Sequence, residues 1–326
     1  MVTAAAAGRS ASFSLACHAC GRCCNSAPSL SMRELFRHRE RFAACLAIGR
    51  VARRRLGERV RIGGREQVLD ADDAGACDAL ADALFMRAAP GHDWLAVTAQ
   101  GFDYPSLDRC PALAGDGRCT LHEAGKPAIC EAVPLDPLAP DRLQPLVLAA
   151  RRDTAAWFGA GCLHDAPVAG AMPLVEAGRV AAPAALDAYR EALRVERTIW
   201  RDAVAAQLLS SGAGWARSWA QLAPGARLTI PVVPALLEIA RVSARCRDAC
   251  LEVADCQQRL IATMIEAALA RRRADDRDAT RELRGFAEAL ARLRRELGSA
   301  AFTAGRPAAA YAKVDAAAVE AWLEVA

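Results

Sequence analysis

The second half of the chain carries apolar residues at three- and four-residue intervals among arginines and acidic residues. This period is typical of amphipathic helices. It predicts helices over about 184–210, 234–273, 275–298 and 315–324. Proline and glycine interrupt the pattern at 224–225, 231–234 and 298–307, because neither residue continues a helix well. We therefore expect this half to be a small helical bundle.

The first half mixes several patterns. Ser31 and Glu34 have the spacing of a capping box and open an apolar stripe, which predicts a helix to about Val51. Charged and β-branched residues alternate around Gly63-Gly64, which indicates a β-hairpin over 59–69. The remaining patterns predict a helix over 72–88 and short extended segments at 94–98 and 143–149.

These patterns divide the chain into three parts. Residues 1–12 have little to bury and are expected to be a disordered lead-in. A loop-rich, cysteine-containing metal-binding domain with a few short strands is predicted over 13–170, and a helical domain over 171–326. The predicted fold class is α+β and mostly helical.

Composition narrows the possible partners. The formal net charge is only +4, and the 40 arginines alternate with acidic residues, so we expect no nucleic-acid partner. No apolar run of about eighteen residues predicts a membrane span, and the alanine stretch 4–7 is too short for a signal peptide. These features favour a cytoplasmic protein without membrane contact, and they leave its oligomeric state open.

The candidate chemistry begins with four cysteines in eight residues, Cys17, Cys20, Cys23 and Cys24. Two-residue gaps allow consecutive thiolates to turn toward one metal ion or cluster, and Gly21 relaxes the backbone between them. Adjacent cysteines cannot easily aim both sulfurs at one tetrahedral zinc. Either one of Cys23 and Cys24 is not a ligand, or the site holds more than one metal atom.

A second group of cysteines follows downstream, namely Cys110, Cys119, Cys130 and Cys162. Gly115-Asp116-Gly117 predicts a tight turn that brings Cys110 and Cys119 together. In a reducing compartment such clustered cysteines are typical of metal ligation rather than of disulfides, whereas an exported chain could pair them. The eight cysteines are the predicted metal ligands.

This pattern of cysteines resembles the CxxCxxCC, or YkgJ-like, family, which is described as zinc- or iron-chelating. The similarity spans about 13–165 and includes the Cys-Pro at 110, the Asp-Gly-x-Cys that ends at Cys119 and the Pro-x-x-Cys that ends at Cys130. Cys162 matches less closely. The chain departs from the family at His122, where an aromatic residue is usual, and at Lys126 and Glu131, where arginines are usual.

The cysteines alone are also similar to those of flagellin lysine N-methylases, which are thought to use an iron–sulfur cluster. The first run lacks the three-residue gap of a radical S-adenosylmethionine cluster, and no glycine-rich loop indicates a nucleotide site. The resemblance therefore reaches only the cysteines.

The other candidate groups have ordinary structural interpretations. Cys45 and Cys77 lie in apolar stripes, and Cys246, Cys250 and Cys256 are expected to be core thiols. His18, His122 and His164 lie near the predicted ligands and could join them or hydrogen-bond to thiolates. His38 is expected on a solvated helix face. Glu34, Asp116, Glu123 and Asp165 are expected in caps, turns or surface pairs.

The leading hypothesis is a cytoplasmic protein that ligates an iron–sulfur cluster, 4Fe-4S preferred, or zinc. Eight motif thiols suit a cluster or two metal ions, since one structural zinc needs four ligands. Two alternatives are an iron–sulfur-dependent protein-modifying enzyme and a structural zinc module of an interaction domain. In each, the helical half could hold a protein partner or substrate. The sequence does not decide whether the protein is an enzyme.

Overall fold

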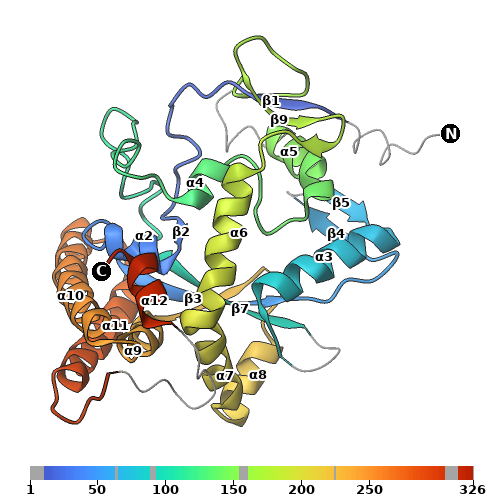
Figure 1. Ribbon diagram of the computed structural model, residues 1–326. Coiled ribbons are helices and arrows are strands. Elements are labelled where there is room, and N and C mark those ends of the chain that lie inside the picture. The colour runs from blue at the N-terminus through green and yellow to red at the C-terminus, as the bar shows by residue number, and fades with distance from the viewer. Residues whose placement is uncertain are drawn as a thin grey trace. The chain divides into compact units, whose positions relative to one another are not determined.

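The computed structural model describes residues 11–62, 65–88, 93–153, 161–223, 225–304 and 315–325. The chain divides into two compact units (Figure 1). The first unit comprises Met1–Asn25, Ala52–Leu84 and Ala112–Glu191, and the second comprises Ser26–Val51, Phe85–Pro111 and Ala192–Ala326. Each unit is therefore assembled from three separate segments of the chain, whereas the sequence analysis placed a single domain boundary after residue 170.

The first unit contains two antiparallel sheets. The larger has the strand order β10-β9-β1-β8 and consists of β1 (Phe13–Leu15), β8 (Leu163–His164), β9 (Met172–Glu176) and β10 (Arg179–Val180). The smaller is the predicted hairpin, formed by β4 (Arg59–Ile62) and β5 (Arg65–Val68). Ser12 Oγ accepts a hydrogen bond from the amide of Ala177, so this end of the predicted lead-in is ordered. Residues 1–10 lie outside the described residues.

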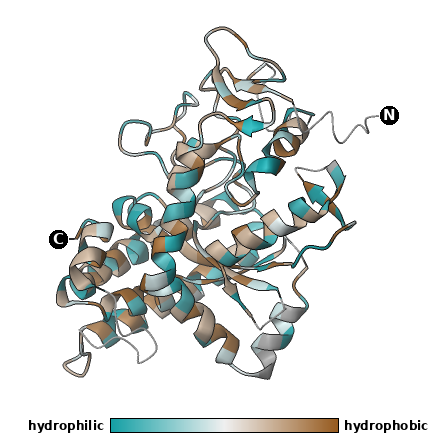
Figure 2. Cartoon of the chain, turned by 45° about the vertical axis from the view of Figure 1, so that its right-hand side comes forward, coloured by the Kyte–Doolittle hydropathy of each residue, from teal (hydrophilic) through white to brown (hydrophobic). Residues whose placement is uncertain are grey.

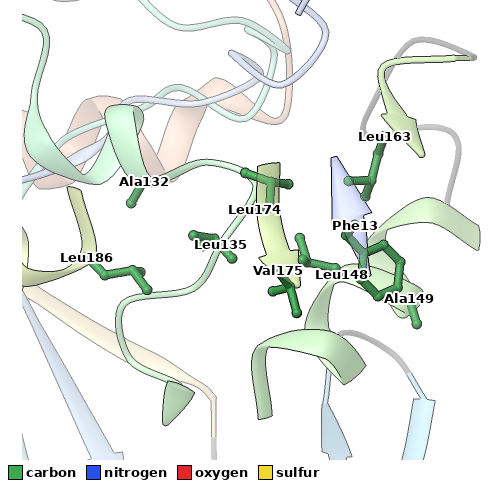
Figure 3. Packing of buried hydrophobic residues seen from close by; sticks show 9 residues of the cluster. All are labelled: Phe13, Ala132, Leu135, Leu148, Ala149, Leu163, Leu174, Val175 and Leu186. Atoms are coloured by element: carbon green, nitrogen blue, oxygen red, sulfur yellow. The ribbon is translucent and has the colours of Figure 1, made fainter. Parts of the chain in front are cut away.

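Short helices complete the first unit. They are α3 (Ala71–Leu84), α4 (Ala128–Ala132), the 3₁₀ turn η1 (Asp141–Leu143), α5 (Gln144–Asp153) and the first part of α6 (Ala184–Glu196). The core gathers Phe13 of β1, Leu148 of α5 and Val175 of β9 in one cluster of buried apolar side chains (Figure 3). A three-residue strand such as β1 has few ladder hydrogen bonds, so Phe13 anchors it chiefly by burial.

The second unit is built on a five-stranded antiparallel sheet. Its order is β11-β3-β7-β2, with β6 also paired to β7. The strands are β2 (Ser29–Leu30), β3 (Ala44–Val51), β6 (Met86–Arg87), β7 (Trp94–Gly101) and β11 (Arg227–Pro231). All eight residues of β3 pair with β7, and β11 covers the other edge of β3. β3 is therefore a central strand.

Helices make up most of the second unit. They are α2 (Met32–Arg37), the π-helical turn η2 (Arg197–Arg201), α7 (Asp202–Ser210), α8 (Ala213–Ala220), α9 (Val233–Ala240), α10 (Ala244–Arg271), α11 (Asp276–Leu297) and α12 (Ala316–Leu323). On α11 the buried residues Leu283, Phe286, Leu290 and Leu293 recur at helical spacing. Figure 2 shows hydrophobic and hydrophilic residues alternating along these helices. Among the helices that the structure describes, none combines the length and the apolar surface that a membrane crossing requires.

The predicted α+β class and the helical C-terminal half are confirmed, and that half also contributes the strand β11. The predicted helices near 72–88, 184–210, 275–298 and 315–324 are present as α3, the α6–η2–α7 run, α11 and α12. The region 234–273 forms two helices rather than one, because Ser243 caps the start of α10 with its side chain.

Two predicted segments are wrong. The capping box at Ser31 is present, but α2 ends at Arg37, and 44–51 is a strand. A strand that is paired on both edges and largely buried shows no alternation of apolar and polar residues, so its pattern does not distinguish it from a buried helix. Conversely, 143–149 is helical. Pro145 fits the first turn of α5, where its missing amide hydrogen costs nothing.

A buried carboxylate ties α2 to the π-helical turn in the second unit. Glu196 accepts hydrogen bonds from the Met32 amide at the start of α2 and from the Trp200 indole. Burial raises the pKa of Glu196 to about 7, and these hydrogen bonds together with nearby Arg201 only partly oppose that rise. Glu34 of α2 raises this pKa further. The start of α2 thus depends on an ionisable group from a distant segment.

Truncation of a core side chain tests the packing of the first unit. Leu148 is completely buried, so Leu148→Ala should lower the free energy of unfolding by about 2–5 kcal/mol through lost burial and the cavity left behind. Leu56 is 74% exposed, and Leu56→Ala in the same unit is the matched control, with an expected change below about 0.5 kcal/mol. Urea unfolding followed by circular dichroism measures both. Equal effects would contradict the assigned core.

The Glu196 carboxyl should make stability depend on pH. Its pKa rises from 4.5 to about 7 on folding, so the folded chain holds this proton more tightly than the unfolded chain. The resulting stabilisation is complete below pH 4.5 and is lost as the pH rises through about 7. The loss amounts to roughly 2–4 kcal/mol. Glu196→Gln should flatten the wild-type fall in unfolding free energy between pH 5 and 8, and an unchanged slope would contradict the assignment.

Candidate metal centre

The first cysteine run begins where β1 ends. Leu15 of β1 pairs with Leu163 of β8, and the Ala16 amide donates a hydrogen bond to the carbonyl oxygen of Cys162 at 2.8 Å. The next residue is Cys17. Strand pairing therefore places the start of the run beside Cys162, which is far away in the sequence but belongs to the same unit.

The run itself is a compact loop. Ala19 and Gly21 have φ values of 51° and 71°, and the Cys24 amide donates to the Gly21 carbonyl at 2.9 Å. A left-handed conformation is unfavourable for alanine and easy for glycine. The loop therefore turns twice within eight residues.

Gly21 also lies against the second cysteine loop. A Cβ atom at Gly21 would stand 2.8 Å from the Gly117 carbonyl oxygen and 3.0 Å from the Leu113 side chain. Only a residue without a Cβ permits this approach. The contact joins the first run to the loop that carries Cys119.

The predicted turn at Gly115-Asp116-Gly117 is confirmed. Gly117 has a φ of 83°, and its amide donates to Ala114 O. The Arg118 amide donates to the Asp116 carboxylate at 3.0 Å. The turn pairs Leu113 with Cys119 in an isolated β-bridge. Cys119 is half-buried in this loop, beside the first run.

The electrostatic environment of the Cys162 thiol includes the Cys17 and Cys20 thiols and the His18 amide. Cys17 and Cys20 are exposed, whereas Cys162 is buried. Burial raises the pKa of the Cys162 thiol, the His18 amide opposes this rise, and the neighbouring thiols add to it. Strand pairing thus brings the start of the first run to the segment that carries Cys162.

The adjacent pair forms a second group. The hydrogen bond with Cys24 is the largest cause that raises the pKa of the Cys23 thiol, and burial adds to it. The positive charge of Lys126 acts in the opposite direction. Lys126 is one of only two lysines in the chain and stands where the CxxCxxCC pattern usually has an arginine. The sequence analysis did not predict that the Lys126 charge acts on the Cys23 thiol. The rarity of lysine in this chain could have drawn attention to Lys126.

The remaining predicted ligands are placed differently. Cys130 is half-buried on α4 and follows Pro127 at the start of that helix. Cys110 is buried and belongs to the second unit. The expected approach of Cys110 to Cys119, and the place of Cys110 and Cys130 in the ligand set, stay predictions.

The thiols do not form a finished metal site. Within the described ranges, no group of three or more His, Cys, Asp or Glu side chains has the arrangement that holds a metal ion. None of the thirteen cysteines, all of which lie in described residues, is in a disulfide. The donor chemistry still fits, because Cys17, Cys20 and Cys162 all offer sulfur, the donor of structural zinc sites and iron–sulfur clusters, and ligation requires only that they lose their protons.

The cysteines assigned to the core lie where that role requires. Cys246, Cys250 and Cys256 are buried on α10, Cys45 is buried, and Cys77 is half-buried on α3. Cys45 was expected in a helical stripe and lies on the strand β3 instead. Burial raises the pKa of Cys45 to about 12, so its thiol stays protonated.

The ionisable residues near the cysteines have structural roles, with one correction. Glu34 completes the capping box, Asp116 closes the turn, and Asp165 pairs with Arg152. His38 was expected on a solvated face, but it is buried and packs edge-on against Phe42. The prediction failed because the chain turns sharply after α2.

Comparison with known proteins finds no matching family model, no matching curated protein and no matching solved structure. The resemblance to the CxxCxxCC family therefore rests on the cysteine pattern itself.

The contact at Gly21 generates a mutational prediction. Gly21→Ala should lower the free energy of unfolding by about 1–3 kcal/mol, because alanine is strained at this φ and its Cβ collides with the Gly117 carbonyl. Gly115→Ala is the matched control, since that position has open space and an ordinary φ. Chemical denaturation compares the two variants. A loss in Gly115→Ala as large as in Gly21→Ala would contradict the close approach of the two loops.

Proposed function

We propose that this protein binds an iron–sulfur cluster, with a 4Fe-4S cluster preferred over zinc, through thiolates of the first run and Cys162. The carrying observation is the pairing of β1 with β8, because it places the start of the run beside Cys162 through the hydrogen bond from the Ala16 amide to the Cys162 carbonyl oxygen. The packing of Gly21 on the Cys119 loop brings a further thiol-bearing segment to the same part of the first unit.

The number and grouping of thiols favour a cluster. A single structural zinc needs four ligands, whereas the first run and Cys162 beside it offer five cysteines. Cys119 and Cys130 lie in the same unit as these five residues. Two zinc ions would also use such a set, and this is the rival proposal. When bound, a cluster supplies one-electron transfer, whereas zinc crosslinks the loops.

We also propose a cytoplasmic location. Cys17, Cys20 and Cys23 are exposed thiols, and a reducing compartment keeps such thiols available for a metal.

Metal analysis of protein purified without air and without added metals tests the proposal. Iron with acid-labile sulfide, and a broad absorption band near about 400 nm, are expected from a cluster. Zinc in a colourless protein would contradict the cluster and support the rival proposal of two zinc ions. A wild-type protein that contains neither metal, and takes up neither iron with sulfide nor zinc on reconstitution, would overturn both.

Two serine variants connect the metal with the assigned thiols. Cys20→Ser removes a predicted ligand and should weaken metal binding by at least about 10–100-fold. A loss of that size is typical when a residue that hydrogen-bonds to a metal ligand is removed, and removal of the ligand itself should cost no less. Cys77→Ser makes the same change at a half-buried thiol of the same unit and should keep the wild-type metal content. Cys250→Ser, in the second unit, should keep it as well. Equal loss in all three variants would contradict the separation of ligands from core thiols.

A further inference from the structure

A cleft of about 830 Å³ lies in the second unit between α2, α10 and the end of α12. Phe36 and Arg37 of α2 line one side, and Ala249 and Val253 of α10 line another. Residues 323–325, at the end of α12, line the third side. Figure 1 shows α12 beside α2 and α10. The cleft has the volume of those that admit small molecules, and the end of α12 closes one side of it.

Ion pairs hold α12 against its neighbours. The Glu324 carboxylate accepts hydrogen bonds from Nε of Arg33 at 2.9 Å and from Nε of Arg37 at 3.2 Å. The Nη2 groups of both arginines also donate to its Oε1 atom. Residues four apart share one face of a helix, so α2 presents both arginines to the same carboxylate. Arg245 of α10 pairs with Glu320 of α12 at 3.0 Å.

These contacts are of a kind that breaks easily. The side chains of Arg33, Arg37 and Glu324 are between 34% and 40% exposed, and exposed ion pairs are weakened by water and salt. The buried apolar side chains of α12 are Val319 and Leu323, whereas α11 buries a longer apolar stripe. Burial therefore holds α12 less firmly than it holds α11.

Two features of α12 are unfavourable while the helix is docked. Glu324 follows the last turn with a φ of 59°, in the left-handed region that glycine adopts more easily than other residues. The Trp322 indole nitrogen is buried and has no hydrogen-bond partner among the residues that the structure describes, and an unpaired buried donor costs free energy. Release of α12 relieves both, because the backbone at Glu324 relaxes and the indole nitrogen reaches water.

We propose that α12 is a latch on this cleft. It leaves α2 and α10 when the ion pairs of Glu324 break, while the sheet and the other helices of the second unit stay folded. Such local opening of a weakly packed element occurs in native proteins without global unfolding. Release opens the side of the cleft that residues 323–325 close. The latch uses none of the proposed metal ligands, so it is tested separately from metal binding.

Hydrogen–deuterium exchange of the full-length chain, read by mass spectrometry, measures the release. In the wild type, amides of α12 should exchange faster than those of α10 and β3, because α12 opens locally. Glu324→Gln removes the charge that both arginines hold. It should speed exchange in α12 by about three- to tenfold, the effect expected for the loss of two exposed ion pairs. Exchange in α10 and β3 should stay unchanged.

Asp278→Asn is the matched control. Asp278 forms an exposed ion pair with Arg281 inside α11, so this variant also loses one carboxylate charge in the second unit but no contact of α12. Exchange in α12 should equal that of the wild type. Circular dichroism checks that both variants are folded.

Two further comparisons isolate the ion pairs. The effect of Glu324→Gln should fall below about twofold in a chain that carries Arg33→Gln and Arg37→Gln, because the partners of the carboxylate are already absent. The effect should also fall below about twofold in about 1 M sodium chloride, where the screening length is about 3 Å.

Several results would overturn the latch. One is unchanged exchange of α12 in Glu324→Gln, and another is equal acceleration of α12, α10 and β3, which indicates a general loss of stability. An effect of Glu324→Gln that persists without the two arginines also contradicts the proposal, as does wild-type exchange of α12 that is no faster than that of α10.

Discussion

The candidate site depends on the antiparallel pairing of β1 with β8. β1 is only three residues long, yet it lies between β8 and β9 and carries Phe13 into the core of the first unit. This pairing places the start of the first cysteine run beside Cys162. Burial of Phe13 therefore stabilises a strand whose ladder is too short to hold the site alone.

The loops around the thiols are held mainly by backbone contacts. Gly21 approaches Gly117 closely, the Asp116 carboxylate closes its own turn, and Cys24 bonds back to Gly21. These contacts join backbone groups of two loops within the first unit. A bound metal would add crosslinks between these loops, which is how metals stabilise small loop-rich domains.

The second unit is stabilised mainly by a buried sheet and by long-range side-chain contacts. A central strand, β3, is covered on both edges, and its first five residues are buried. The first turn of α2 uses the buried Glu196 carboxylate as an acceptor for a helix-terminal amide. Because this group comes from a segment more than 160 residues away, the unit is stabilised by contacts that have no local sequence signal.

The sequence alone was enough to predict most of the amphipathic helices, the hairpin of β4 and β5, the capping box at Ser31 and the turn at Asp116, because each depends on neighbouring residues. It also identified the cysteine run as candidate chemistry. Long-range packing was needed to show that 44–51 is a strand, that the first cysteine run begins beside Cys162, and that Cys110 belongs to the second unit. Strand pairing and burial join segments far apart in the chain, and local periodicity carries no information about such partners.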